Sequence, residues 1–179
     1  MGSGERDRCV LLCGLMGSGK SRVGRALASR LGWDFLDTDE RVEEAAGMKV
    51  SEIFAREGEA AFRRLESTAL AGLPAQRCVV ALGGGTVVSA ENRRVLRAKG
   101  RLVWLDAAPE TLVERIGDSQ KRPLLAGLDR PARIARLAQL RAERLAAYSE
   151  AELHVRTDGM SVAESAAAVH AALEEAGGP

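Results

Sequence analysis

The segment Gly14–Ser21, Gly-Leu-Met-Gly-Ser-Gly-Lys-Ser, carries the most specific chemical pattern in the chain. It matches the phosphate-binding pattern G-x-x-x-x-G-K-[ST] without a mismatch. Its glycines permit a tight turn that points backbone N–H groups at an anion, and the helix expected to follow adds its positive end. A lysine at position 20 can reach the β- and γ-phosphates of a nucleotide, and a serine hydroxyl at position 21 can hold Mg²⁺. The segment therefore predicts a nucleotide site.

Two carboxylates, Asp37 and Asp39, come shortly after the apolar pair Phe35-Leu36, where a short strand is expected to end. Side chains two residues apart project the same way from an extended chain. One carboxylate could bind Mg²⁺ directly or through water, and the other could hold an acceptor hydroxyl. A solvated acidic turn would be the simpler interpretation of this segment alone. Its position after a phosphate loop favours a functional site.

Two later segments could recognise a small polar molecule. Arg63 and Glu66 are i, i+3 neighbours on a predicted helix, and an arginine held by a glutamate is a pre-aligned fork for a carboxylate. The alternative is an exposed ion pair of little energetic worth. Gly83-Gly84-Gly85 follows an apolar run, and three successive glycines let the backbone approach a ligand closely. The alternative there is a bare turn.

The segment 117–130 is bounded by glycines and polar at both ends, and a connection of this length in a compact domain is often a functional lid. We expect the lid to span residues 117–128. Arg122, beside the rigid Pro123, could reach the transferring phosphate as an arginine finger. Arg144 and Tyr148 follow on a predicted helix whose buried side carries Ile134 and Leu137.

Composition limits the remaining classes. With 179 residues, 46% hydrophobic and 28% charged residues, the chain is expected to form one domain, residues 1–179, of an ordinary soluble protein. The net charge of +1 predicts neither a nucleic-acid nor a membrane partner. The longest apolar run, 10–16, is far too short to span a bilayer, and we expect a cytoplasmic protein. The three cysteines are expected to be small buried residues, and His154 and His170 stand isolated, so no resident transition-metal site is predicted.

The order of elements indicates an α/β fold. Helix patterns separate the apolar runs, which predicts a parallel sheet with helices on both faces. One helix follows the phosphate loop and ends at Gly32, and the last begins at the capping box of Ser161 and Glu164 and buries Val162 with later apolar residues. Strands are expected over 8–13, 77–82, 101–105 and 152–156, with the short strand at 35–36. Ligands gather at the carboxyl ends of such strands.

From about residue 8 to residue 173, the ordered set of motifs resembles the shikimate kinase family. The resemblance rests on the phosphate loop, Asp37-Thr-Asp39, Phe62-Arg63-x-x-Glu66, the triple glycine, Arg122-Pro-Leu-Leu and Arg144-x-x-x-Tyr148. It implies a three-layer P-loop kinase sandwich with an acceptor-binding helical segment over about 37–73 and the lid. It also implies transfer of a phosphoryl group from ATP, with Mg²⁺, to the 3-hydroxyl of shikimate on the way to chorismate and the aromatic amino acids. We expect the enzyme to be a monomer.

The resemblance also implies a role for individual residues. On the nucleotide side, Arg115 packs on adenine, Arg122 closes with the lid, Ser21 and Asp37 serve Mg²⁺, and the ATP phosphates are held by Gly17, Ser18, Gly19, Lys20, Ser21 and Arg22. On the acceptor side, Asp39 binds the hydroxyls and takes the 3-hydroxyl proton, the Gly84 amide seats the ring, and the carboxylate and pocket contacts come from Arg63, Arg144, Phe54 and Phe62. Thr157–Met160 departs from the cationic or amide residue that many members place near adenine.

Two other functions fit part of the pattern. A related small-molecule kinase, such as a gluconate kinase, would share the phosphate loop, but the other acceptor motifs disfavour it. A kinase-like ligand sensor of a transcription regulator would need a DNA-binding segment, and only about eight residues precede the first strand. The presence of Lys20, Asp39 and Arg122 also favours an active enzyme.

Overall fold

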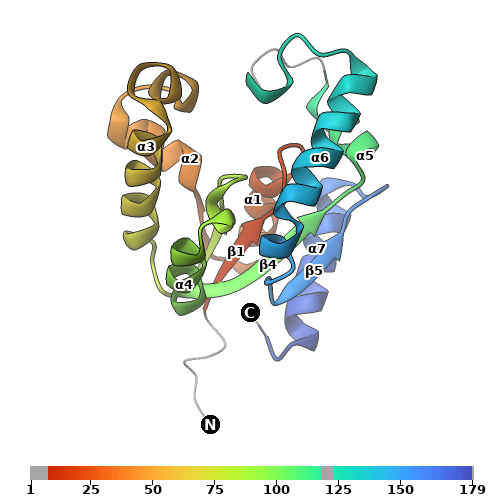
Figure 1. The fold of residues 1–179 in the computed structure, drawn as a ribbon. Helices are drawn as coiled ribbons and strands as arrows, with labels where there is room; N and C mark the ends of the chain where they lie inside the picture. The colour runs from red at the N-terminus through yellow and green to blue at the C-terminus, as the bar shows by residue number, and fades with distance from the viewer. Residues whose placement is uncertain (1–7, 118–122, 179) are drawn as a thin grey trace.

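The computed structural model of the chain describes residues 8–117 and 123–178. Its centre is one sheet of parallel strands in the order β2-β3-β1-β4-β5 (Figure 1). The strands are β1 (Cys9–Cys13), β2 (Asp34–Asp37), β3 (Cys78–Ala81), β4 (Gly100–Asp106) and β5 (Leu153–Arg156). Every strand expected from the sequence is present, and the predicted parallel α/β sheet is confirmed.

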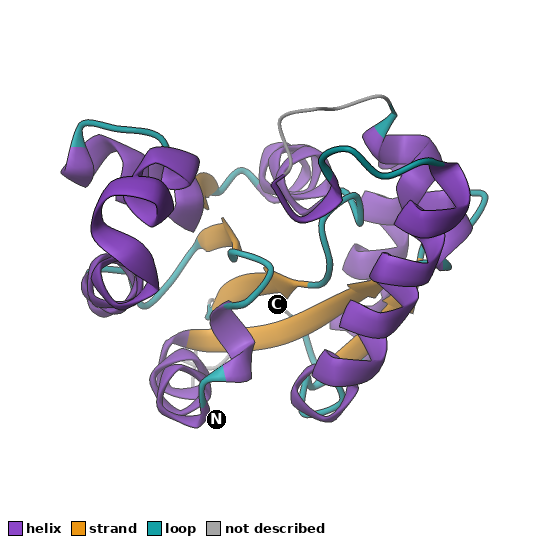
Figure 2. Ribbon diagram, turned by 45° about the horizontal axis from the view of Figure 1, so that its top comes forward, coloured by secondary structure: helices purple, strands orange, loops and turns teal. Residues whose placement is uncertain are grey.

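Helices cover both faces of the sheet because the side chains of its central strand alternate between them (Figure 2). Val10 and Leu12 of β1 pack with α1 (Lys20–Leu31) and α7 (Val162–Glu175). Leu11 and Cys13 pack on the opposite face with the end of α3 (Val50–Ala71), α4 (Ala90–Lys99), α5 (Pro109–Ile116) and α6 (Arg130–Tyr148). The result is the expected three-layer sandwich, with its core on both sides of β1.

Helix ends follow local sequence signals. Gly32 ends α1 in the left-handed conformation, with φ 66°, and Ser161 and Glu164 form the predicted capping box of α7. Val162 was expected to be buried, but it is 37% exposed, because it occupies the first helical position, before the face that meets the sheet. All three cysteines are buried free thiols, as expected. None of the helices described here is long and apolar enough to cross a membrane.

The α2–α3 arm stands beside the carboxyl end of β2, opposite the upper part of α6 (Figure 1). Here α2 (Thr38–Ala46) starts directly after β2, and α3 is bent at Gly58, whose φ of 81° interrupts the helix. The prediction that both Asp37 and Asp39 project from an extended chain is therefore wrong for Asp39, whereas Asp37 is the last, extended residue of β2. Asp37 caps α2 by accepting from the backbone N–H groups of Asp39 and Glu40, and Asp39 lies in the first helical turn.

The predicted lid falls partly outside the described residues, and so does Arg122. The described part contains a short 3₁₀ turn, η2 (Pro123–Leu125), followed by the start of α6 at Arg130. Leu125 is buried in the core, whereas Leu124 is 44% exposed. Asp129 caps α6, so residues 130–133 form the first helical turn.

Candidate active site

The phosphate loop connects β1 to α1 at the carboxyl end of the central strand. Its glycines adopt positive φ angles that other residues rarely reach, including 81° at Gly17 and 92° at Gly19. A Cβ atom at Gly17 would lie 2.8 Å from the carbonyl oxygen of Leu112, so the loop also packs closely on α5. The Lys20 ammonium donates to the carbonyl oxygens of Gly14 and Leu15, at 2.9 and 3.0 Å. These contacts hold the lysine across the mouth of the loop.

A hydroxyl and a carboxylate meet beside this loop. Ser21 Oγ, in the first turn of α1, donates to Asp37 Oδ2 at 2.6 Å, although 16 residues separate them in the chain. Oxygen donors of this kind suit Mg²⁺, which is commonly held by one or two protein ligands together with water and substrate phosphates. The donor set therefore fits the predicted ion. No cluster of three or more His, Cys, Asp or Glu residues suitable for a metal occurs in the described part of the chain.

Asp39 points at the triple glycine. A Cβ atom added to Gly83 would lie 2.7 Å from Asp39 Oδ1, so a side chain at this position would push the carboxylate aside. Thr38, which is 1% exposed, fixes the same juxtaposition by accepting from the Gly83 backbone N–H at 2.9 Å. The start of α2 and the turn after β3 are thus joined next to Asp39. Thr38 is a site-building residue that sequence reasoning missed, since a threonine between two aspartates carries no distinctive signal.

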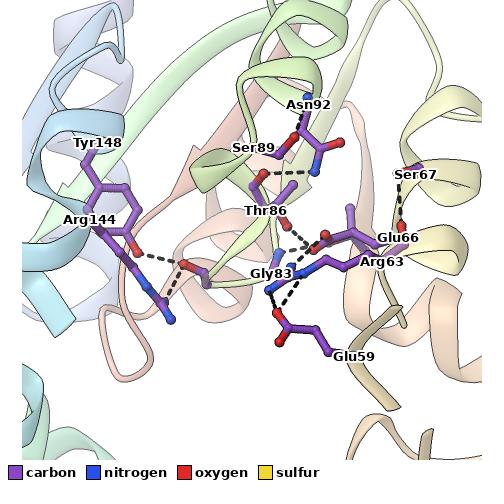
Figure 3. A network of polar contacts seen from close by, with 12 residues as sticks. Glu59, Arg63, Glu66, Ser67, Gly83, Thr86, Ser89, Asn92, Arg144 and Tyr148 are labelled. Carbon is purple, nitrogen blue, oxygen red and sulfur yellow. Dashed lines mark hydrogen bonds and ion pairs between the residues drawn. The ribbon is translucent and has the colours of Figure 1, made fainter. Parts of the chain in front are cut away.

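Arg63 approaches the glycine turn from α3 (Figure 3). Its Nη1 donates to Glu66 Oε2 at 2.9 Å, and its Nη2 donates to Glu59 Oε1 at 3.1 Å. Glu66 is 2% exposed, so the interaction differs from the exposed ion pair considered as the alternative. Burial alone would lower the pKa of Arg63, but the hydrogen bond and charge of Glu66 raise it. Arg63 therefore stays charged.

Behind Arg63, a chain of hydrogen bonds links α3 to the segment after the triple glycine (Figure 3). Thr86 Oγ1 donates to Glu66 Oε1 at 2.7 Å, and Asn92 Nδ2 donates to the Thr86 carbonyl oxygen at 3.0 Å. All three side chains are buried. A buried network with its partners satisfied rigidifies the groups it joins. It holds Arg63 in one orientation beside Gly85, whose Cβ atom would lie 3.3 Å from Arg63 Nη2.

Arg144 approaches the same turn from α6, opposite Arg63 (Figure 3). Arg144 Nη1 and the Tyr148 hydroxyl both donate to the Gly84 carbonyl oxygen at 2.8 Å. Burial raises the pKa of Tyr148 to about 12, so its hydroxyl keeps the proton that it donates. A Cβ atom at Gly84 would lie 3.5 Å from Arg144 Nη1 and 3.7 Å from the Gly14 carbonyl oxygen. The glycine turn therefore adjoins both an arginine and the phosphate loop.

Two aromatic side chains from α3 are in contact near Arg63. The rings of Phe54 and Phe62 have centroids 4.7 Å apart, although Gly58 bends the helix between them. Phe62 is buried, Phe54 is 40% exposed, and the Arg63 guanidinium carbon lies 5.3 Å from the Phe62 ring centroid. The pair offers an apolar surface beside the cationic one.

At the expected adenine site, hydrogen bonds join α5 and the residue before it to the loop 157–160. Arg115, on α5, donates to Thr157 Oγ1 at 2.9 Å, to the Thr157 carbonyl oxygen, and to the Met160 carbonyl oxygen at 3.4 Å. Asp158 accepts from the Ala108 backbone N–H at 2.8 Å. The departure at Thr157–Met160 therefore lies against Arg115, and the two segments form one surface.

Among the described residues, the structure brings the acceptor and phosphate groups together at the carboxyl ends of the strands. The arrangement offers a carboxylate, two arginines converging on a glycine turn, and an anion-binding loop. Such groups can bind a small hydroxylated carboxylate and align one of its hydroxyls with a phosphoryl donor.

Comparisons with known proteins agree with this geometry. Residues 16–174 match the family model described as shikimate kinase. The chain is 45% identical over 166 residues to the shikimate kinase of Moorella thermoacetica, covering 92% of this chain and 94% of that protein. The solved structure of shikimate kinase from Acinetobacter baumannii in complex with shikimate superposes with a TM-score of 0.84 and 34% identity, covering 92% of each chain.

A gluconokinase from Sinorhizobium meliloti 1021 is also similar, with a TM-score of 0.61 and 20% identity over 96% of this chain and 94% of that one. This lower similarity shows a shared fold alone.

Proposed function

The chain belongs to the shikimate kinase family, and we propose that it works through Asp39, Arg63, Arg144 and the glycine turn on one side and the phosphate loop on the other. Its reaction is the ATP-dependent phosphorylation of the 3-hydroxyl of shikimate, which yields shikimate 3-phosphate and ADP. The observation that best supports the residue roles is the position of Gly84, between Arg144 and the phosphate loop. Acceptor and donor groups lie on either side of it.

Each group has a defined task in this proposal. Arg63 and Arg144 bind the shikimate carboxylate, the Gly84 N–H contacts the ring substituents, and Phe54 and Phe62 cover its apolar face. Asp39 accepts a hydrogen bond from the 3-hydroxyl and takes its proton as the hydroxyl oxygen bonds to the γ-phosphorus. The bond from that phosphorus to the bridging oxygen breaks, and ADP leaves with the electron pair.

The phosphate side supplies positive charge where negative charge accumulates. Lys20 and the loop amides of residues 17–22 hold the β- and γ-phosphates, and Arg115 packs on adenine. Ser21 and Asp37 would hold Mg²⁺, Asp37 through water, and the ion would neutralise phosphate charge. Arg122 lies outside the described residues, so its role at the transferring phosphate stays a prediction from the family resemblance.

We further propose that residues 1–179 act as one monomeric kinase domain in the cytoplasm, with 37–73 as the acceptor-binding segment. The three free thiols are consistent with a reducing compartment. The lid over 117–128 stays a prediction because part of it lies outside the described residues.

Acceptor specificity is tested by measuring ADP release with shikimate, gluconate and quinate as alternative acceptors. Turnover with shikimate is expected to exceed turnover with gluconate, because all three acceptors offer the two arginines a carboxylate but open-chain gluconate lacks the compact ring that suits the glycine turn. Faster turnover with gluconate than with shikimate would contradict the proposed site.

Replacing Arg63 or Arg144 by alanine is expected to weaken shikimate binding at least about 30-fold, because removing one partner of a desolvated charge pair costs roughly 2–5 kcal/mol. ATP affinity should change little. Equilibrium binding of each ligand, measured separately, checks the result.

Arg64→Ala is the matched control, because Arg64 is the exposed neighbour of Arg63 on α3. It should leave both affinities unchanged. An equal loss of shikimate and ATP affinity in the Arg63 and Arg144 variants would instead indicate a general folding role.

A further inference from the structure

A buried carboxylate at the end of β4 has no part in the mechanism above. Asp106 is 4% exposed and accepts from Arg141 Nε at 3.0 Å and Arg141 Nη2 at 2.7 Å, a two-point contact with α6. His154 Nε2, on β5, lies 3.2 Å from Asp106 Oδ2. Burial alone would raise the pKa of the Asp106 carboxyl, but the hydrogen bonds and charge of Arg141 keep it below the usual value. Asp106 is therefore ionised at neutral pH.

Arg141 lies on the helix that carries the proposed carboxylate-binding arginine. Arg141, Arg144 and Tyr148 are separated by three and then four residues, so they share one face of α6. The first contacts Asp106, and the other two contact the Gly84 carbonyl oxygen. The face of α6 that presents Arg144 is thus attached to the sheet about one turn earlier, at Arg141.

Aromatic packing fixes the same contact. The ring of Trp104, on β4, stacks with the Tyr148 ring at a centroid distance of 5.5 Å and with the His154 ring at 4.1 Å. The Arg141 guanidinium carbon lies 5.6 Å from the Trp104 ring centroid. Aromatic packing already holds α6 against the sheet. The two-point contact with Asp106 further restricts the orientation of the helix, because a planar guanidinium pairs with a carboxylate in few orientations.

The nucleotide side depends on a different part of the same residue. The main-chain carbonyl oxygen of Asp106 accepts from the Thr157 backbone N–H at 2.9 Å and from Thr157 Oγ1 at 3.2 Å. Thr157 in turn accepts from Arg115. A substitution of the Asp106 side chain keeps the main-chain carbonyl group. It therefore breaks the contact with Arg141, on the acceptor side, and leaves the contacts with Thr157, on the nucleotide side, in place.

We propose that Asp106 is a positioning residue for the acceptor site: through Arg141 it sets the height and rotation of α6, and so holds Arg144 where it meets the shikimate carboxylate. The inference rests on the proposed role of Arg144. Neither Asp106 nor Arg141 contacts the substrate itself. Loss of either side chain should therefore weaken recognition of the shikimate carboxylate and leave ATP binding unchanged.

The test uses Asp106→Asn, which keeps the side-chain size but removes the charge and one of the two oxygens that accept from Arg141. The KM for shikimate should rise about tenfold, within the range of coupling energies for residues of one network, while the KM for ATP changes less than about twofold. The kcat at saturating shikimate should fall less than about threefold by the same reasoning. Arg141→Lys keeps the charge but lacks the planar guanidinium. It should give the same pattern with a smaller rise in the KM for shikimate.

A neutral acceptor separates positioning from general loosening. With shikimate carboxamide in place of shikimate, Arg144 has no carboxylate to meet, so the difference between Asp106→Asn and the parent protein should nearly disappear. The double variant Asp106→Asn/Arg141→Lys should be no worse than the more defective single variant, because both substitutions break the same contact. Arg136→Gln is the control: its side chain contacts Gln139 and Glu143 on the surface of the same helix, and it should behave as the parent.

Three outcomes would overturn the proposal. They are an unchanged KM for shikimate in folded Asp106→Asn, an equal rise in both KM values, or a defect that persists with the carboxamide. Melting temperatures measured for every variant identify any that do not fold, in which case Arg141→Lys decides. Arg144→Ala is assayed in parallel: if it leaves shikimate binding intact, the proposed function of Arg144 fails, whereas a defect there without one in Asp106→Asn defeats only this inference.

Discussion

Lys20→Ala is expected to reduce turnover by about 10³-fold, the upper range for removing one preorganised charge-stabilising group. The lysine lies across the mouth of the phosphate loop, where its ammonium donates to the carbonyl oxygens of Gly14 and Leu15. A nucleotide would draw the same ammonium to its β- and γ-phosphates, where charge accumulates during transfer. Steady-state ADP release with saturating ATP and shikimate measures the loss.

The fold should survive this substitution, because the loop is shaped by its glycines and by packing on α5. Circular dichroism should therefore match that of the parent protein. Lys49→Ala is the matched control, since the Lys49 side chain is 72% exposed and pairs with Glu43 far from the loop. Near-normal turnover in folded Lys20→Ala would refute the assignment of the phosphate loop.

Asp39→Asn is expected to reduce kcat at least about 10²-fold, the usual contribution of a positioned acid or base. The substitution keeps the size that fits against Gly83 but removes the charge that accepts the hydroxyl proton. Stability should fall by no more than about 1 kcal/mol, the worth of a carboxylate in the first turn of a helix. Single-turnover kinetics, in which a preformed complex of enzyme and shikimate is mixed with limiting ATP, measure the transfer step directly.

Glu40→Gln is the control for Asp39, because Glu40 is the next acidic residue of α2 and pairs with Arg25 at the surface. It should retain the parent rate. If Asp39→Asn keeps most of its rate with shikimate while Lys20→Ala loses it, Asp39 lies outside the reacting centre, and the base must be sought elsewhere.

The strongest sequence predictions concerned groups whose positions depend on short stretches of chain. The Gly32 helix stop and the Ser161 capping box involve residues within about one helical turn of one another, and the phosphate loop involves eight consecutive residues, Gly14–Ser21. The strand and helix order followed from periodicity for the same reason. These elements were predicted correctly because neighbours in sequence supply most of the interactions that define them.

Predictions that required a neighbour's conformation fared less well. Asp37 and Asp39 were expected on an extended chain, but capping by Asp37 starts α2 immediately and turns Asp39 toward Gly83. His154 looked isolated, yet β5 pairs with β4 and brings it to Asp106. No local pattern indicates which strand will be adjacent, so neither contact could be read from the residues around it.

The amino-acid order is sufficient to specify the anion-binding loop, the parallel sheet and the kinds of side chain available for chemistry, because turn geometry and hydrophobic periodicity act over a few residues. Tertiary packing alone places Arg63 and Arg144 on opposite sides of the glycine turn, since they come from α3 and α6, some 80 residues apart. It also makes Glu66 a buried partner and Asp106 an anchor for α6. Burial changes the free energy of a charged group and of its ion pair, and which groups are buried depends on how the layers assemble.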